Sequence, residues 1–156
     1  MLQWLEDSVM AAAIRQSLWL YPALEIVHII GIVLLVGPAL MFDARLLGLS
    51  PNISVASLSR HLLPWARRSL IILIIPSGIL LFSTNAVTLA EDPVFFLKLS
   101  LLVIAIANAF IFHRFVFRPE VAWNSNTAIP FRAKVNAVLS IVLWLMIIAC
   151  GRLLAY

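Results

Sequence analysis

The sequence predicts an all-α integral membrane protein, a bundle of four transmembrane helices preceded by a short amphipathic helix. Hydrophobic residues make up 63% of the 156 residues and charged residues only 12%, whereas soluble domains carry about a quarter charged residues. The apolar residues gather in four long runs, and a helix needs about 20 of them to cross the hydrocarbon core of a bilayer. We therefore expect one membrane domain over 1–156, because four spans with short connections leave no room for a soluble domain.

Residues 1–17 are expected to form a helix that lies in the membrane interface and leads into the bundle. Apolar side chains recur at helical spacing at Leu2, Leu5, Val9, Ala12 and Ala13, and the positions between them are largely polar. The segment lacks the basic start and the small-residue cleavage site of a secretory signal peptide. The helix that follows is therefore expected to be retained.

The four spans are expected at about 18–40, 60–83, 93–117 and 131–156. Trp19 and Tyr21 stand where an aromatic interface belt is expected at the start of span one. Pro93 suits the first turn of a helix, where no backbone N–H is needed. Arg67 and Arg68 precede the strictly apolar part of span two, so they are expected to snorkel or to face protein and water.

The basic residues predict how the bundle is oriented in the membrane. Of the eleven Lys and Arg residues, eight fall in or beside the first and third connections: Arg45, Arg60, Arg67, Arg68, Arg114, Arg118, Arg132 and Lys134. Cytoplasmic loops carry an excess of Lys and Arg, so both termini are expected on the non-cytoplasmic side. The net charge of +4 is thus a topology signal, and no nucleic-acid partner is expected.

Glu25 and His28 are the first titratable residues inside a predicted span. Their spacing of three places the carboxylate and the imidazole on one helical face. A charged group in lipid costs about 2.5–3.5 kcal/mol on insertion scales, so such groups point to function. A neutral imidazole in an apolar slot between helices suits axial ligation of haem b. The alternative is a structural contact, in which the two side chains bond each other or a neighbouring helix.

Lys98 lies one turn into span three, on the same side of the membrane as His28. Its ammonium group could pair with Glu25, hold a haem propionate, or ligate iron once desolvated. The alternative is an interfacial lysine that snorkels to the lipid headgroups.

Three further residues lie toward the other side of the membrane: His61, Asn108 and His113. The two histidines could hold a second haem if they faced each other, or a metal if a third ligand joined them. The alternative is that they are solvated interface groups. Asp43 and Arg45, near the end of span one, could pair with Arg67, Arg68 or a lipid phosphate, which would be anchoring chemistry.

Other motifs that carry chemistry are absent from the sequence. There is no Walker loop, dinucleotide-binding glycine pattern, covalent haem motif, zinc protease motif or nucleophile elbow. The single Cys150 can form neither an internal disulfide nor a thiolate cage. Redox or transport chemistry is therefore favoured over hydrolysis.

Four stretches of the sequence carry a family resemblance: Tyr21-Pro-Ala-Leu-Glu25-Ile-Val-His28-Ile-Ile-Gly31, Asp43-Ala-Arg45-Leu-Leu-Gly48, Pro64-Trp65, and Asp92-Pro-Val-Phe-Phe-Leu-Lys98-Leu with Asn108. Together they resemble a small, functionally uncharacterised family of bacterial four-helix membrane proteins, which implies a bacterial inner membrane. More distantly, His28 with Lys98 resembles the pair found in the membrane protoporphyrinogen IX oxidase family, which binds haem b. The stretch from Lys98 to Asn108 also resembles the membrane domain of the copper-resistance D family.

These observations predict a haem b-binding membrane protein that transfers electrons, with His28 as axial ligand and Lys98 and Glu25 near the haem edge. Its expected partners are the lipid bilayer, a quinone or another redox partner, and further copies of itself in a homo-oligomer. Two alternatives stay open. One is a carrier or channel for a small solute or copper, although the four methionines form no cluster of the soft ligands that Cu(I) prefers. The other is a non-catalytic subunit of a larger complex.

Overall fold

The computed structural model describes residues 2–116 and 129–154, so Arg118 and the predicted span ends at Phe117 and Tyr156 lie outside the described residues. Its helices are α1 (Gln3–Glu6), α2 (Val9–Gln16), α3 (Leu20–Leu46), α4 (Val55–Ser69), η1 (Leu70–Ile74), α5 (Ile75–Thr84), α6 (Ala86–Glu91), α7 (Pro93–Ile111), η2 (Phe112–Val116) and α8 (Phe131–Leu153). The described residues contain no strand.

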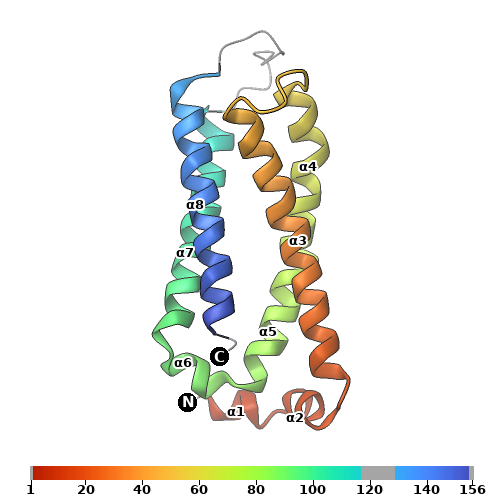
Figure 1. Cartoon of the computed structure of the whole chain (residues 1–156). Helices are drawn as coiled ribbons and strands as arrows, with labels where there is room; N and C mark the ends of the chain where they lie inside the picture. The colour runs from red at the N-terminus through yellow and green to blue at the C-terminus, as the bar shows by residue number, and fades with distance from the viewer. Residues whose placement is uncertain (1, 117–128, 155–156) are drawn as a thin grey trace.

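Four helical segments are long and apolar enough to cross a membrane: Leu20–Leu46, Val55–Thr84, Pro93–Phe115 and Phe131–Leu153. This confirms the predicted four-helix membrane fold. Figure 1 shows the four segments side by side, with α1, α2 and α6 across one end, where both termini also lie. We call this the terminal end. The opposite end, which carries the α3–α4 connection (residues 47–54) and the start of α8, is called the basic end.

The N-terminal segment forms two helices where one was predicted. Ser8 separates them, because its backbone is extended and its hydroxyl accepts a hydrogen bond of 3.2 Å from the backbone N–H of Ala11 at the start of α2. Ala11 and Ile14 are the buried residues of α2, whereas Val9 is 86% exposed. The apolar face predicted through Val9 is therefore not the face that packs on the bundle.

Hydrogen bonds fasten these N-terminal helices to the terminal end of the bundle. Arg15 donates to the Thr84 carbonyl at 3.0 Å and to the Glu6 carbonyl at 2.6 Å. The carboxylate of Glu6 accepts a 2.9 Å bond from the backbone N–H of Val87, in the first turn of α6. Glu6 thus satisfies one of the unpaired N–H groups at the start of that helix.

The α3–α4 connection is held from inside by Arg45. Its guanidinium donates to the Ile53 carbonyl and, at 3.1 Å, to the Pro51 carbonyl. Arg45 is buried, so its role is to bind this connection, and it does not reach across to Arg67, Arg68 or lipid as the sequence had suggested. The sequence predicted that Arg45 has an anchoring role, and the segment that it anchors is this connection.

The second span is continuous but changes helix type in its middle. It begins at Val55, earlier than the predicted start near Arg60, because Ser54 caps it by accepting from the Ser57 N–H at 3.1 Å. The π-helix η1 then precedes Pro76, which stands in the first turn of α5. Proline has no N–H to donate and its ring crowds the preceding turn, so a widened turn there accommodates it.

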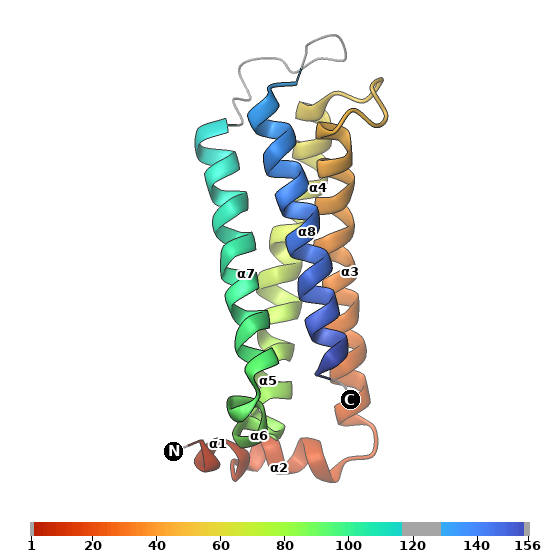
Figure 2. The ribbon, with the colours of Figure 1, turned by 60° about the vertical axis from the view of Figure 1, so that its left-hand side comes forward.

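Two apolar clusters form the core of the bundle. The first includes Leu35, Val36, Ala66, Ile74, Leu101, Ala105, Leu143, Trp144, Ile147 and Cys150, and the second, toward the basic end, includes Phe42, Leu46, Val55, Phe112, Ala133 and Ala137. In Figure 2, α8 passes between α7 and α3. Helix α3 packs against α4 and α5, helix α8 packs against α7, and the contact between α3 and α8 joins the two pairs of spans. Within the described chain, α4 and α5 make no close backbone contact with α7 or α8. Many large apolar side chains point outward, as expected for helices in lipid.

Candidate functional site

The imidazole of His28 lies between helices, where it is bonded to a serine. Its Nδ1 is 2.8 Å from the hydroxyl oxygen of Ser77 in α5. That hydroxyl has one proton, and it donates it to the Leu73 carbonyl one turn earlier in its own helix. We therefore assign the Ser77 oxygen as the acceptor and Nδ1 of His28 as the protonated nitrogen.

This arrangement leaves the other ring nitrogen of His28, Nε2, with a free lone pair. Metal-ligating histidines commonly donate their second N–H to a protein oxygen, and that bond sets both the tautomer and the ring orientation. His28 is therefore held in the form that can ligate a metal ion or haem iron through Nε2.

Two glycines make room for this contact between α3 and the second span. A Cβ at Gly78 would lie 3.3 Å from Cε1 of His28, so a side chain there would press on the ring. A Cβ at Gly31, three residues after His28, would lie 2.8 Å from Cγ1 of Ile74 and 3.0 Å from Cβ of Leu73. The hydroxyl of Ser69 also donates to the Gly31 carbonyl at 2.6 Å. Close approach of the two backbones therefore positions the imidazole.

Lys98 reaches toward the same site from α7. Its Nζ lies 3.7 Å from the position of a Cβ on Gly151, an ordinary van der Waals distance, so the ammonium group packs against α8. Lys98 is near Cys150 and close enough to His28 for its charge to act on the imidazole. The structure thus gives Lys98 a contact with α8, and its pairing with His28 stays a prediction.

Within the described residues Glu25 makes no hydrogen bond to His28, which was one expected structural contact, and the imidazole bonds Ser77. Its side chain is exposed and lies one turn from Tyr21, on which its charge acts. Among the described residues, no ion pair joins Glu25 to Lys98. Glu25 therefore lies on the terminal-end side of His28 and contacts neither His28 nor Lys98 through a hydrogen bond or ion pair among the described residues.

The three other predicted site residues lie toward the basic end, apart from His28. The Asn108 side chain is 8% exposed, and its Oδ1 accepts a 2.7 Å bond from Nδ2 of Asn136 in α8. His61 is exposed and bonds the Ser57 carbonyl of its own helix at 2.8 Å. The ring of His113 stacks on Phe42, with centroids 6.3 Å apart. The described contacts do not bring His61 and His113 together, so a second haem there stays a prediction.

Sequence reasoning missed three of the residues that build these contacts: Ser77, Gly78 and Asn136. Ser77 and Gly78 follow Pro76 in an apolar run, and this local break in the helical pattern was the available signal. A serine in a membrane helix carries little cost because it can bond its own backbone. Asn136 lies just inside span four, where a polar side chain looks like an interface residue.

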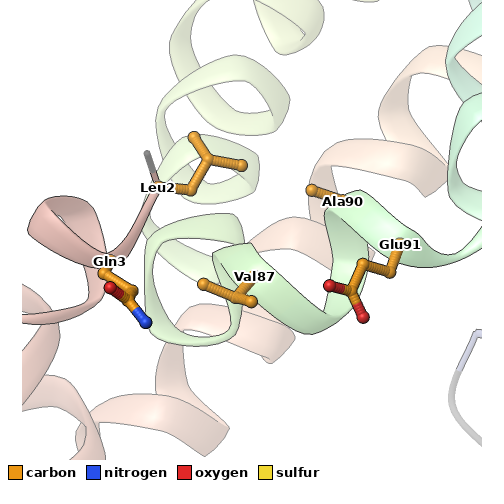
Figure 3. A pocket seen from close by; sticks show the side chains of 5 residues that line it. All are labelled: Leu2, Gln3, Val87, Ala90 and Glu91. Atoms are coloured by element: carbon orange, nitrogen blue, oxygen red, sulfur yellow. The ribbon is translucent and has the colours of Figure 1, made fainter.

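A pocket of about 310 Å³ lies at the terminal end, lined by Leu2, Gln3, Val87, Ala90 and Glu91. Figure 3 shows Leu2 and Gln3 beside α6, which carries the other three residues. This pocket is not at His28. Among the described residues, no three His, Cys, Asp or Glu side chains lie together as a metal site, but an axial haem ligand requires only one imidazole.

The fold defines a small multi-pass membrane protein, with His28 bonded to Ser77 between two of its helices. Over residues 1–156 the chain matches the family DUF6644, described as a family of unknown function, and it belongs to this family. No curated protein and no solved structure matches the chain significantly. The uncharacterised family expected from the sequence is thus confirmed, and the more distant similarities to the oxidase and copper-resistance families find no support in these comparisons.

Proposed function

We propose that this protein binds haem b in the membrane and transfers electrons, with His28 as an axial ligand. The observation that carries the proposal is the hydrogen bond between His28 Nδ1 and the Ser77 hydroxyl. That hydroxyl itself donates to the Leu73 carbonyl. It leaves Nε2 unprotonated and fixes the ring, as a haem ligand requires. Haem b would supply one-electron redox chemistry at its iron.

The residues around His28 fit such a group in their chemistry. The ammonium of Lys98 provides the positive charge that a propionate carboxylate needs in an apolar environment. Gly78 and Gly151 keep side chains away from His28 and Lys98. Glu25 is exposed, and in this proposal it lies near the haem edge. What supports haem here is ligand chemistry and not a preformed cavity.

We further infer that the protein works in a bacterial inner membrane, with both termini on the non-cytoplasmic side. Arg45 in the last turn of α3, Arg60 of α4, and Arg132 and Lys134 at the start of α8 lie toward one end. Glu6, Glu91 and Asp92 lie toward the other. The positive-inside rule then places the His28 site toward the non-cytoplasmic face. A membrane quinone is the partner class that suits a redox site at this depth, and the large outward apolar surface suits assembly into a homo-oligomer.

The visible spectrum of the purified protein tests the haem proposal. We expect stoichiometric haem b, identified by a pyridine haemochrome assay on protein expressed with added haem precursor. H28A should lose the haem and its Soret absorption. The matched control is S83A, which removes a buried hydroxyl that bonds the Leu80 carbonyl of its own helix and should keep the full signal.

Two results would contradict the proposal. One is a full Soret band in H28A that remains correctly folded by circular dichroism. The other is wild-type protein that takes up no haem in detergent or in nanodiscs. In the second case, metal-dependent uptake into liposomes would point to a carrier, and a stoichiometric co-purifying protein would point to a subunit of a larger complex.

A further inference from the structure

A second polar site lies toward the basic end of the bundle, around Asp43 of α3. Asp43 is only 5% exposed. Its Oδ2 is sealed from solvent and has no hydrogen-bond partner within the described chain. Buried carboxylate oxygens normally have partners, so an orphaned one requires an explanation.

Polar side chains from two other helices lie toward the same end of the bundle. The Ser140 side chain of α8 lies near the Asp43 carboxylate. Asn136, one turn earlier on the same face of α8, donates to Asn108 of α7 at 2.7 Å. Helices α3, α7 and α8 thus each contribute an oxygen-bearing side chain toward the basic end.

Apolar residues close this polar site along the bundle axis. Phe42, Phe112 and Ala137 belong to the core cluster toward the basic end. Leu143 and Trp144, the latter one turn beyond Ser140, belong to the other cluster. A charge at Asp43 is therefore surrounded by a medium that solvates it poorly.

The neighbouring cationic groups do not neutralise Asp43. Arg45 of α3 is directed to the carbonyls of the α3–α4 connection, and His113, beyond α7, stacks on Phe42. Lys134 of α8 and Arg68 of α4 are exposed. Among the described residues, none of these forms an ion pair with Asp43, and an unpaired buried carboxylate is strongly destabilising.

We propose that Asp43 Oδ2 is an intramembrane binding site for a small monovalent cation, either a proton or Na⁺. Either ion adds one positive charge and makes the carboxylate site neutral. The Asp43 carboxylate and the nearby Ser140 hydroxyl offer the oxygen atoms that a hard cation prefers, and buried membrane carboxylates commonly mark ion or proton pathways. The site is separate from His28, so it does not depend on whether haem binds.

Carboxyl ¹³C NMR of the full-length protein in nanodiscs tests this site directly. The chain contains three aspartates, Asp7, Asp43 and Asp92, so aspartate labelling gives a simple spectrum. D43N identifies the resonance of Asp43, and D7N with D92N identifies it by elimination if D43N does not fold. We then follow the Asp43 resonance against pH without Na⁺, and against Na⁺ replacing choline at constant pH.

The S140A variant distinguishes the two ions. A hydroxyl that donates to a carboxylate stabilises its charged form, so if the ligand is a proton, S140A should bind it about tenfold more tightly. If the ligand is Na⁺, the hydroxyl oxygen is a ligand, and S140A should bind Na⁺ about tenfold more weakly. A response in either direction, confined to Asp43, supports the site.

Two outcomes would overturn the proposal. In the first, the Asp43 resonance titrates together with that of exposed Asp7 and ignores Na⁺, which would make Asp43 an ordinary carboxylate in water. In the second, the resonance responds neither to Na⁺ nor to pH across the range in which the protein stays folded.

Discussion

His28 and Ser77 join α3 to α5 through a 2.8 Å hydrogen bond in which the imidazole is the donor, because the serine hydroxyl is already donated to the Leu73 carbonyl. The bond sets the tautomer of a histidine that the sequence could only place on a helical face. It also directs Nε2 away from Ser77. The two residues act as one unit, so removing the serine should weaken what the histidine binds without removing it.

The first prediction concerns Ser77. S77A should lower haem affinity about 10- to 100-fold, because the ring loses the partner that orients it and holds its tautomer. Haem titration into apoprotein, followed at the Soret band, measures this. S83A is the matched control, since Ser83 is buried in the same helix and bonds only the Leu80 carbonyl of that helix. Equal affinity in the two variants would remove Ser77 from the site.

The second prediction concerns Gly31. G31A should destabilise the bundle by about 1–3 kcal/mol, because the added Cβ would lie 2.8 Å from Ile74 and 3.0 Å from Leu73. Equilibrium unfolding in a denaturing detergent mixture gives the free energy. G37A is the control, because no atom lies within 4 Å of a Cβ there. If the two variants are equally stable, the close packing of α3 against η1 is wrong.

The third prediction concerns the fastening of the N-terminal helices. R15A should release α1 and α2 from the bundle, because it removes the bonds to the Thr84 and Glu6 carbonyls, together worth about 1–3 kcal/mol. Hydrogen exchange over residues 3–16 should become faster, while the spans keep their protection. D7N changes a neighbouring exposed side chain and should leave exchange unchanged.

The fourth prediction concerns Asn108 and Asn136, whose amides are 2.7 Å apart. A double-mutant cycle of N108A and N136A should give a coupling energy of about 0.6–1.7 kcal/mol, the range for hydrogen bonds between membrane helices. A cycle of N136A with N85A should give none, since Asn85 is exposed near the start of α6. Additive effects for the first pair would argue against the contact.

The fifth prediction tests orientation. In a C150A background, which removes the single cysteine, Q16C lies at the terminal end and N52C in the α3–α4 connection, and both positions are exposed. A membrane-impermeant maleimide should label Q16C in intact spheroplasts and N52C only after permeabilisation. The reverse pattern would place both termini in the cytoplasm and invert the proposed topology.

Much of the fold could be read from the sequence, because a spanning helix depends on a local property of the chain. Twenty or so consecutive apolar residues suffice, whatever their neighbours. Pro93 begins α7, with the Asp92 side chain capping it at 2.7 Å, in agreement with its expected place in a first turn. The division of the N-terminal segment at Ser8 also had a local signal, because serine is a common N-cap residue. The apolar spacing across Ser8 nevertheless predicted one continuous helix.

The site was predictable only in part. Titratable residues in lipid are costly and therefore conspicuous, so His28, Lys98 and Asp43 stood out among apolar neighbours. Their partners did not, because Ser77, Ser140 and Asn136 are small or lie near a predicted span end. The sequence placed Glu25 and His28 together on α3, but the two side chains are not bonded. The imidazole instead bonds Ser77 of the neighbouring helix α5.

The sequence by itself determined that this is a four-helix membrane protein and which titratable groups enter the bilayer, since both follow from the residues of each segment and the cost of placing them in lipid. Only the tertiary structure decided what each group contacts. The close approach at Gly31, the π-helix before Pro76 and the central place of α8 bring Ser77 to His28, Gly151 to Lys98 and Ser140 to Asp43. These pairings depend on how helices distant in the chain pack, and no local pattern encodes that packing.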